Sequence, residues 1–161
     1  MSEAMTPPPG FEAVPTGLGF TDNLQPLFRR VDGQWPEFGL VVSEPHLNMM
    51  GVCHGAALMC LADISAASGI NTAAGKTAGS PTINLAVDFI AAGKRGEWLQ
   101  SSIDHVSLRR RFGFCAGVIE GPGGLVARFN GTFYLPDHKG VWKGPVRDAG
   151  GVLGVEPEGS S

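Results

Sequence analysis

The chain has 161 residues, which is enough for one globular domain and too few for two full ones. Hydrophobic residues make up 43% of it, and the formal charge of −3 excludes a general attraction to nucleic acid or to anionic membranes. The three cysteines form no CxxC pair, and the N-terminus lacks the basic and apolar stretches of a signal peptide. We therefore expect reduced thiols and a cytoplasmic protein that binds neither nucleic acid nor membranes.

The first quarter of the chain has few regular patterns. Residues 1–20 are rich in proline and glycine and are expected to form a flexible arm that adds little to the core. A short helix is expected over Asp22–Phe28. Residues 38–42 form a short apolar run that predicts a strand, which ends before Pro45.

The stretch from Ala56 to Ala74 is dominated by Ala, Leu, Met, Cys and Ile, with small Ser and Gly residues between them. It is apolar on nearly every side, a pattern typical of a helix that is buried in the centre of a domain. Gly75 and Lys76 are the predicted end of this helix.

Four predicted strands follow the helix, over residues 82–90, 97–108, 111–120 and 125–135. In the first, Leu85 and Val87 share a face with Ile83 and Phe89, whereas Thr82 belongs to the opposite face. In the third, the alternating apolar positions are Phe112, Phe114, Ala116 and Val118.

Consecutive strands with short connections imply an antiparallel sheet, and one apolar helix packed on that sheet gives an α+β domain. A sheet curled around a single central helix is the hotdog fold. We expect this domain over residues 21–136, followed by a Gly/Pro-rich tail over residues 137–161.

Asp63 is the only formally charged residue between Glu44 and Lys76, in the middle of the predicted helix. An unpaired buried carboxylate costs several kcal/mol, and perturbed acids concentrate at active sites. We therefore interpret Asp63 as catalytic. The alternative is that it caps a neighbouring helix or bonds backbone amides at a subunit contact.

His54 precedes Asp63 by nine residues, which is half a turn of rotation in a helix. The two side chains of one chain therefore face opposite ways. If they cooperate, a second copy must bring its Asp63 to the first copy's His54. This predicts a two-fold homodimer with two active sites at its interface.

The segment before the helix supplies further candidates. Backbone N–H groups at a helix N-terminus are unpaired donors with a favourable dipole, and Gly55 has no Cβ to hinder a substrate carbonyl. Such a donor stabilises an oxyanion, and Asn48 is a candidate to hold the water or the carbonyl. Alternatively, Asn48 and Gly51 are only turn residues and His54 a structural histidine.

The run Asn48-x-x-Gly51-x-x-His54-Gly55, followed by Asp63, resembles the signature of hotdog-fold acyl-CoA thioesterases of the phenylacetate-degradation (PaaI-like) type. The similarity continues through Asp88–Phe89 to Ala127-x-x-x-Gly131-x-Phe133 and covers roughly residues 38–136.

The resemblance implies a role for each matching position. Asp63 would be the nucleophile or the general base, and the Gly55 N–H would polarise the thioester carbonyl, helped by Asn48 and His54. Thr82 matches a hydroxyl position that orients the attacking water. One departure is Ala56, where the family usually has a second glycine. Because Ala56 keeps its backbone N–H, we expect it to narrow the local space rather than to abolish activity.

The substrate would contact two further groups of residues. Arg109, Arg110 and Arg111 lie in the turn between the second and third strands after the helix, and adjacent guanidinium groups suit the phosphates of coenzyme A. The alternative is a solvated basic turn. The acyl chain is expected in an apolar slot lined by Met49, Met50 and Phe89, completed by the partner chain.

The sequence thus predicts an enzyme that hydrolyses an acyl-CoA, aromatic or medium-chain, to free acid and CoA without a metal or organic cofactor. It acts as a homodimer, or as a dimer of dimers. No zinc spacing, GxGxxG, P-loop or GxSxG motif occurs. Rival interpretations are a hotdog hydratase and a non-catalytic acyl-CoA-binding module.

Overall fold

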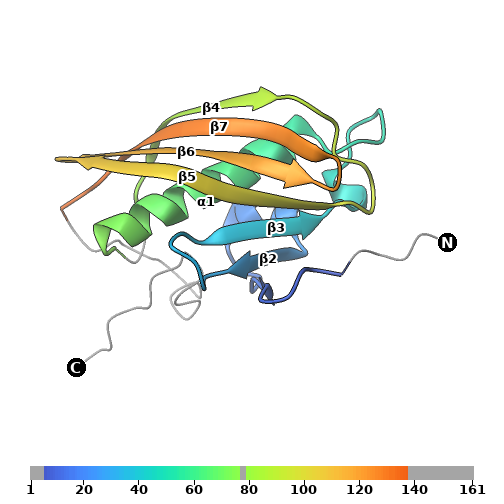
Figure 1. Ribbon diagram of the computed structural model, residues 1–161, viewed down its shortest axis with the longest axis horizontal. Coiled ribbons are helices and arrows are strands. Elements are labelled where there is room, and N and C mark those ends of the chain that lie inside the picture. The colour runs from blue at the N-terminus through green and yellow to red at the C-terminus, as the bar shows by residue number, and fades with distance from the viewer. Residues whose placement is uncertain (1–5, 77–78, 138–161) are drawn as a thin grey trace.

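A computed structural model describes residues 6–76 and 79–137, so the predicted tail from residue 138 onward lies outside the described residues (Figure 1). The strands are β1 (Glu12–Ala13), β2 (Leu27–Arg30), β3 (Glu37–Val41), β4 (Thr82–Phe89), β5 (Trp98–Arg109), β6 (Phe112–Gly121) and β7 (Gly124–Tyr134). The α-helix α1 spans Gly55–Ala74, and two 3₁₀ helices are η1 (Gly19–Leu24) and η2 (Glu44–His46).

All described strands join one antiparallel sheet in the order β1-β2-β3-β5-β6-β7-β4. The long strands arch over α1, which runs along one face of the sheet (Figure 1). This two-layer arrangement confirms the predicted α+β hotdog fold. The edge strands of the sheet are β1 and β4.

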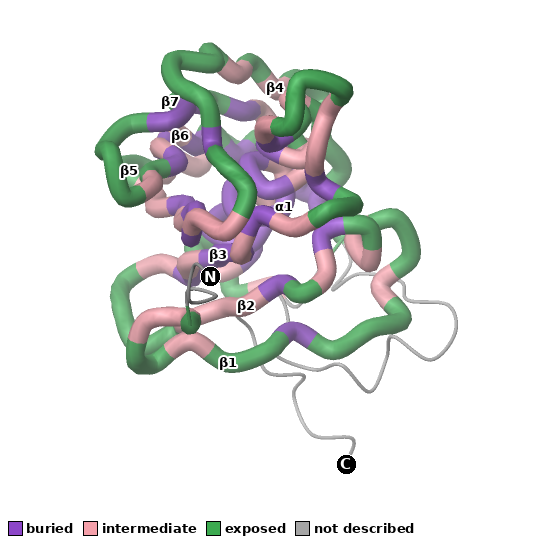
Figure 2. Tube along the Cα trace, turned by 90° about the vertical axis from the view of Figure 1, so that its right-hand side faces the viewer, coloured by how far each residue is buried: buried purple, intermediate pink, exposed green. Residues whose placement is uncertain are grey.

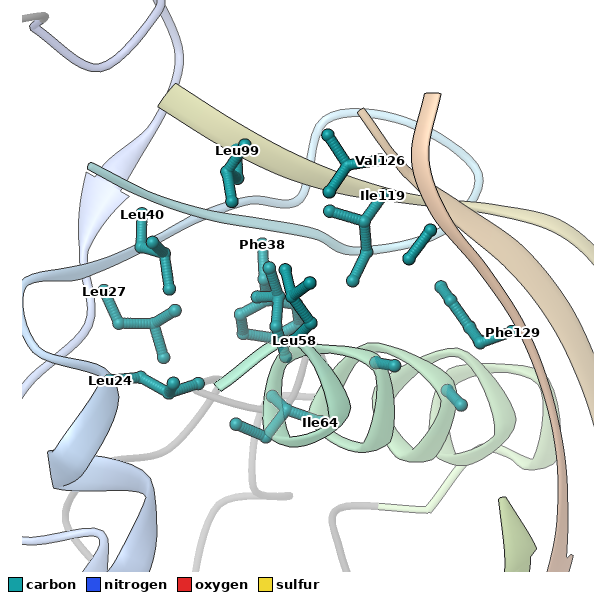
Figure 3. Packing of buried hydrophobic residues seen from close by; sticks show 14 of the residues in the cluster. Leu24, Leu27, Phe38, Leu40, Leu58, Ile64, Leu99, Ile119, Val126 and Phe129 are labelled. Carbon is teal, nitrogen blue, oxygen red and sulfur yellow. The ribbon is translucent and has the colours of Figure 1, made fainter. Parts of the chain in front are cut away.

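The core lies between α1 and the sheet. Side chains from β2, β3, β5, β6 and β7 converge on the helix from above and from the side (Figure 3). The largest fully buried ones include Phe38, Phe133, Leu61, Ile70 and Ile119. Each such side chain contributes about 1.5–3 kcal/mol of hydrophobic free energy, so this contact between the two layers is the main stabilising element.

The ends of α1 follow the expected signals. His54 occupies the N-cap, and Gly75 adopts a left-handed conformation (φ 63°) at the C-cap, as the predicted stop required. By length and composition α1 would be able to cross a membrane, but half of that stretch is buried inside the domain, as in a core helix.

The burial of α1 is less complete than its composition indicated. In Figure 2, the buried segments of α1 (purple) lie next to segments that are half-buried or exposed. Ala56 and Met59 are exposed, and Cys60, Asp63 and Ala67 are partly buried. At 100° per residue these five positions form one stripe. A single chain therefore leaves one face of its central helix uncovered.

The N-terminal third differs from the sequence prediction. The helix expected over residues 22–28 is instead η1, which ends at Leu24, and residues 27–30 form β2. The cause is Pro26, which has no N–H and disfavours helical geometry in the residue before it. The predicted arm also contributes to the core, because Val14 is 3% exposed and donates its N–H to the Leu27 carbonyl.

The face of β6 that meets α1 is not the one that carries the alternating apolar positions of the sequence. Phe112 and Phe114 are exposed, whereas Gly113 and Cys115 are buried toward the helix. The reason is close approach: a Cβ on Gly113 would lie 2.6 Å from Cγ2 of Ile70. Apolar alternation identified the strand but not the face that the helix covers.

Candidate active site

Asn48 organises the loop that leads into α1. Its Oδ1 accepts hydrogen bonds from the N–H groups of Met50 (2.9 Å) and Val52 (3.3 Å), an arrangement of the Asx-turn type. The loop closes on itself through a bridge between Leu47 and Cys53. Since the oxygen of Asn48 is engaged, its amide Nδ2 is the part of the side chain left to bind a substrate or a water.

His54 caps the first turn of α1. Its Nδ1 accepts a hydrogen bond from the Ala56 N–H at 2.9 Å, so Nδ1 carries no proton and Nε2 is the protonated nitrogen. The Ala56 N–H, which the sequence left available to a substrate, is thereby engaged. Gly55 offers the remaining backbone donor, because the N–H groups of Ala57 and Leu58 bond to the His54 carbonyl.

Phe89, at the end of β4, covers Gly55. A Cβ on Gly55 would lie 3.3 Å from Cζ of the Phe89 ring, which is tighter than an ordinary contact. The glycine therefore lets the aromatic ring pack directly against the helix N-terminus. A substrate carbonyl at the Gly55 N–H would have this half-exposed ring as its neighbour.

Asp63 and Thr82 meet at the middle of α1. The Thr82 hydroxyl donates a hydrogen bond of 2.7 Å to Oδ1 of Asp63. Asp63 is partly buried and forms no ion pair within the described part of the chain. Its Oδ2 has no hydrogen-bond partner within the described residues.

A β-bulge between Thr82 and Asn84 makes this contact possible. Strict alternation assigned Thr82 to the face opposite Leu85 and Val87. The bulge adds one residue, so Thr82 pairs with the inward-facing Phe133 and turns toward the helix. Bulges near active sites often re-aim a side chain in this way.

The predicted catalytic residues form two separate groups within one chain. Asn48, His54 and Gly55 lie at the N-terminus of α1, and Asp63 lies with Thr82 at its middle. Nine residues correspond to about 13 Å along the helix axis. No side chain spans that distance, so the two groups of one chain do not meet in one site.

The predicted acyl-contact residues are strongly exposed. Met49 is completely exposed, Met50 is 77% exposed and Phe89 is 53% exposed. Met49 and Met50 project from the loop, and in a single chain they do not enclose a slot with Phe89.

The three consecutive arginines differ in their surroundings. Arg111 pairs with Asp137 and donates a hydrogen bond of 3.1 Å to the Tyr134 hydroxyl. Arg110 holds a positive φ of 54° in the tight turn between β5 and β6, and Arg109 donates to the Leu108 carbonyl. Among the described residues, Arg109 and Arg110 have no acidic partner, so these two guanidinium groups are available to an anion.

The family model of the thioesterase superfamily matches residues 50–127, which include Asp63, Gly55 and Thr82. A Pseudomonas aeruginosa protein named "Putative esterase PA0474" is 29% identical over 133 residues, which are 82% of this chain and 99% of that protein. The match to the family model extends across α1, β4, β5 and β6 and ends within β7.

Solved structures show the same architecture. The phenylacetic acid degradation protein PaaI from Thermus thermophilus, solved as a point mutant, superposes with a TM-score of 0.61 at 24% identity, over 68% of this chain and 93% of that one. PaaI from E. coli gives 0.61 at 22% identity, over 71% and 83%. A hypothetical thioesterase from Streptococcus pneumoniae, solved with coenzyme A, gives 0.63 at 16% identity, over 81% and 98%.

Proposed function

We propose that this protein is an acyl-CoA thioesterase of the hotdog fold and that Asp63 is its catalytic carboxylate, acting at a site shared by two chains. The observation that carries the proposal is the hydrogen bond of 2.7 Å from Thr82 to Asp63. It orients one carboxylate oxygen and leaves the other free on an uncovered helix face. A purely structural carboxylate would more often have a cation or several amides around it.

The second half of the site comes from the partner chain. Asp63 and the helix N-terminus are about 13 Å apart in one chain, so an antiparallel pair of helices is needed to join them. The uncovered stripe around Met59 is the surface on which the second helix would pack. The neighbouring edge strand β4 supports this pairing, because Ile83, Phe89 and Ile90, on the strand and directly after it, are each more than half exposed.

In this arrangement the helix N-terminus binds the thioester carbonyl. The Gly55 N–H donates to the oxygen that becomes negative during attack, and the helix dipole favours that charge. Asn48 contributes its free Nδ2 and His54 its Nε2–H at the same position. Three neutral donors around one oxygen stabilise the tetrahedral intermediate.

Asp63 then promotes attack on the thioester carbon. In one route its Oδ2 removes a proton from a water, whose hydroxide adds to the carbon; in the other, Oδ2 itself attacks and water cleaves the resulting anhydride. Both routes release the CoA thiol and the free acid. Thr82 holds Asp63 in the orientation that either route needs.

The nucleotide part of CoA would bind at the turn between β5 and β6. Arg109 and Arg110 are exposed and have no acidic partner among the described residues. Paired guanidinium groups suit phosphate oxygens. The Arg111 side chain pairs with Asp137 and bonds to Tyr134, so it would stabilise the turn and contact the ligand less than Arg109 and Arg110 do.

The decisive experiment measures thiol release from a panel of acyl-CoAs by wild type and Asp63→Asn. We expect the variant to lose about 100- to 10,000-fold in kcat while it still binds CoA. Asp104→Asn, a change at an exposed carboxylate on β5, is the matched control and should retain activity.

Three results would contradict the proposal. Full activity of Asp63→Asn would remove the carboxylate from the mechanism. Tight binding of acyl-CoA by wild type without turnover would indicate a binding module, and addition of water to an enoyl-CoA would indicate a hydratase.

A further inference from the structure

Thr82 reaches Asp63 from the first position of an edge strand. β4 pairs with β7 on one side and ends the sheet of the described chain on the other. The β-bulge between Thr82 and Asn84 also interrupts the pairing at this point. Strand ends with few hydrogen bonds are the parts of a sheet that open first. The hydrogen bond of 2.7 Å from Thr82 to Asp63 therefore depends on what holds the residues just before β4.

A buried hydrogen bond connects this segment to α1. The Ser80 hydroxyl donates to Oδ1 of Asn71 at 2.6 Å, and both residues are buried, Ser80 with 8% and Asn71 with 1% of its surface exposed. Asn71 lies about two helical turns after Asp63. The chain therefore runs back along the helix, so that Ser80 contacts Asn71 and Thr82 contacts Asp63.

Asn71 also holds the end of α1. Its backbone carbonyl accepts the Lys76 N–H at 2.9 Å, and the Gly75 N–H bonds to the Thr72 carbonyl at 3.2 Å, which is the Schellman pattern of a helix end. One asparagine therefore fixes both where the helix ends and where the chain returns to it. Asparagine is a poor helix former, and a buried amide costs free energy unless it is bonded. Packing alone does not favour it at this position.

Pro81 connects Ser80 to Thr82 with little conformational freedom. Its ring fixes φ near about −65° and restricts the preceding residue to extended geometry. Its carbonyl accepts the Tyr134 N–H of β7 at 2.9 Å. A displacement of Ser80 would therefore be passed on to Thr82 instead of being absorbed between them.

We propose that Asn71 and Ser80 are positioning residues of the reaction, which hold Thr82, and through it Asp63, in the reactive orientation. The inference rests on the proposed thioesterase function. Both side chains are buried and bonded to each other, so they act through Thr82 and not on the substrate. A displacement of about 1 Å at a reacting group costs up to about 100-fold in rate, and the loss of one remote bond should cost part of that.

The test is a double-mutant cycle, assayed by thiol release from the acyl-CoA that wild type hydrolyses fastest. Ser80→Ala should lower kcat about 3- to 10-fold while KM stays close to that of wild type. In a Thr82→Val background the same change should lower kcat less than about twofold, because no hydroxyl is left to position. Asn71→Ala removes the bond from the helix side and should give the same pattern.

Ser101→Ala is the matched control. Its hydroxyl is also buried, and it bonds to the Ser65 hydroxyl and to the Phe38 carbonyl. Ser65 lies about 200° around α1 from Asp63, so this bond is on the other side of the helix. We expect Ser101→Ala to lower the urea midpoint, as Ser80→Ala does, but to leave kcat unchanged.

Three results would overturn the positioning role. They are an unchanged kcat in Ser80→Ala, an equal loss with and without the Thr82 hydroxyl, and an equal loss of kcat in Ser101→Ala. If Asn71→Ala does not fold, Ser80→Ala decides alone. Each of these results leaves the proposed function intact as long as Asp63→Asn abolishes hydrolysis. A wild-type protein that hydrolyses no acyl-CoA, or a fully active Asp63→Asn, would refute both.

Discussion

In the proposed mechanism, Thr82 acts on the reaction through Asp63. Its hydroxyl is the sole side-chain partner of that carboxylate within the described residues, so its removal lets Asp63 rotate. We predict that Thr82→Val lowers kcat about 10- to 100-fold with little change in KM, since misplacement of a reacting group costs this much. Thr82→Ser keeps the donor and should restore most of the rate.

Steady-state kinetics of both variants would check this prediction. If Thr82→Val kept the kcat of wild type, Thr82 would have only a structural role. If the variant only raised KM, Thr82 would have a substrate-binding role.

His46 links stability to pH. It is 1% exposed, its Nδ1 accepts the Ser43 N–H, and burial lowers its pKa below the ordinary 6.5. Below pH 6.5 the unfolded chain therefore binds a proton that the folded protein does not. Stability should fall as the pH drops from 6.5 toward the lowered pKa, by up to about 1.4 kcal/mol per pH unit, and this loss should be absent above pH 6.5.

Urea unfolding between about pH 7.5 and pH 5 measures the effect, a range that brackets the ordinary histidine pKa. His46→Phe should be less stable at the upper end of this range, because it loses the bond to Ser43, but its stability should fall less steeply with acid. His105→Gln, at an exposed position on β5, should keep the slope of wild type. An unchanged slope in His46→Phe would assign the pH dependence to other groups.

At the scale of elements, the contact between α1 and β6 depends on glycine. Gly113 lies opposite Ile70 of the helix, and an added Cβ would be 2.6 Å from its Cγ2. We predict that Gly113→Ala lowers the free energy of unfolding by about 1–3 kcal/mol, the usual cost of overpacking. Gly123→Ala, in a turn with open space around it, is the control and should be close to neutral.

Equilibrium denaturation of both variants separates this effect from the general effect of replacing a glycine with alanine. If Gly113→Ala were as stable as Gly123→Ala, Ile70 would have room to move and the helix would not require glycine at this position.

The bounds of some helices and strands were predicted from the sequence more closely than those of others, and the difference has a physical reason. Those with long uninterrupted patterns, α1 and the four long strands, have bounds close to the expected ones. The short helix expected over residues 22–28 was wrong because Pro26 interrupts it, and η1 has too few residues for a helical pattern. The inward face of β6 was missed because glycine carries no hydrophobic signal.

At the scale of the whole molecule, the proposed two-chain site predicts complementation between two inactive variants. Asp63→Asn removes the carboxylate, and Asn48→Asp removes the Nδ2 donor while keeping the oxygen that holds the loop. In a mixed dimer one site receives Asp63 from one chain and Asn48 from the other. Random mixing should therefore restore about a quarter of wild-type activity.

The experiment uses coexpressed chains with different tags, so that mixed dimers can be isolated and assayed. If the mixed dimers were as inactive as the two single variants, Asp63 and Asn48 would have to act within the same chain. Coexpression of Ala73→Leu, a change at an exposed position of α1, with Asp63→Asn is the control for the tags. In these mixed dimers only the site that receives an intact Asp63 should be active.

By itself, the sequence determined the central helix with its Gly75 stop, the long strands and the isolated carboxylate of Asp63. These features follow from local periodicity, glycine conformation and charge, which are properties of neighbouring residues. Only the tertiary structure decided the bulge that turns Thr82 toward Asp63, the tautomer of His54 and the hydrogen bond from Ser80 to Asn71. Each of these depends on contacts between groups whose approach is set by packing of the whole domain, and packing has no local pattern.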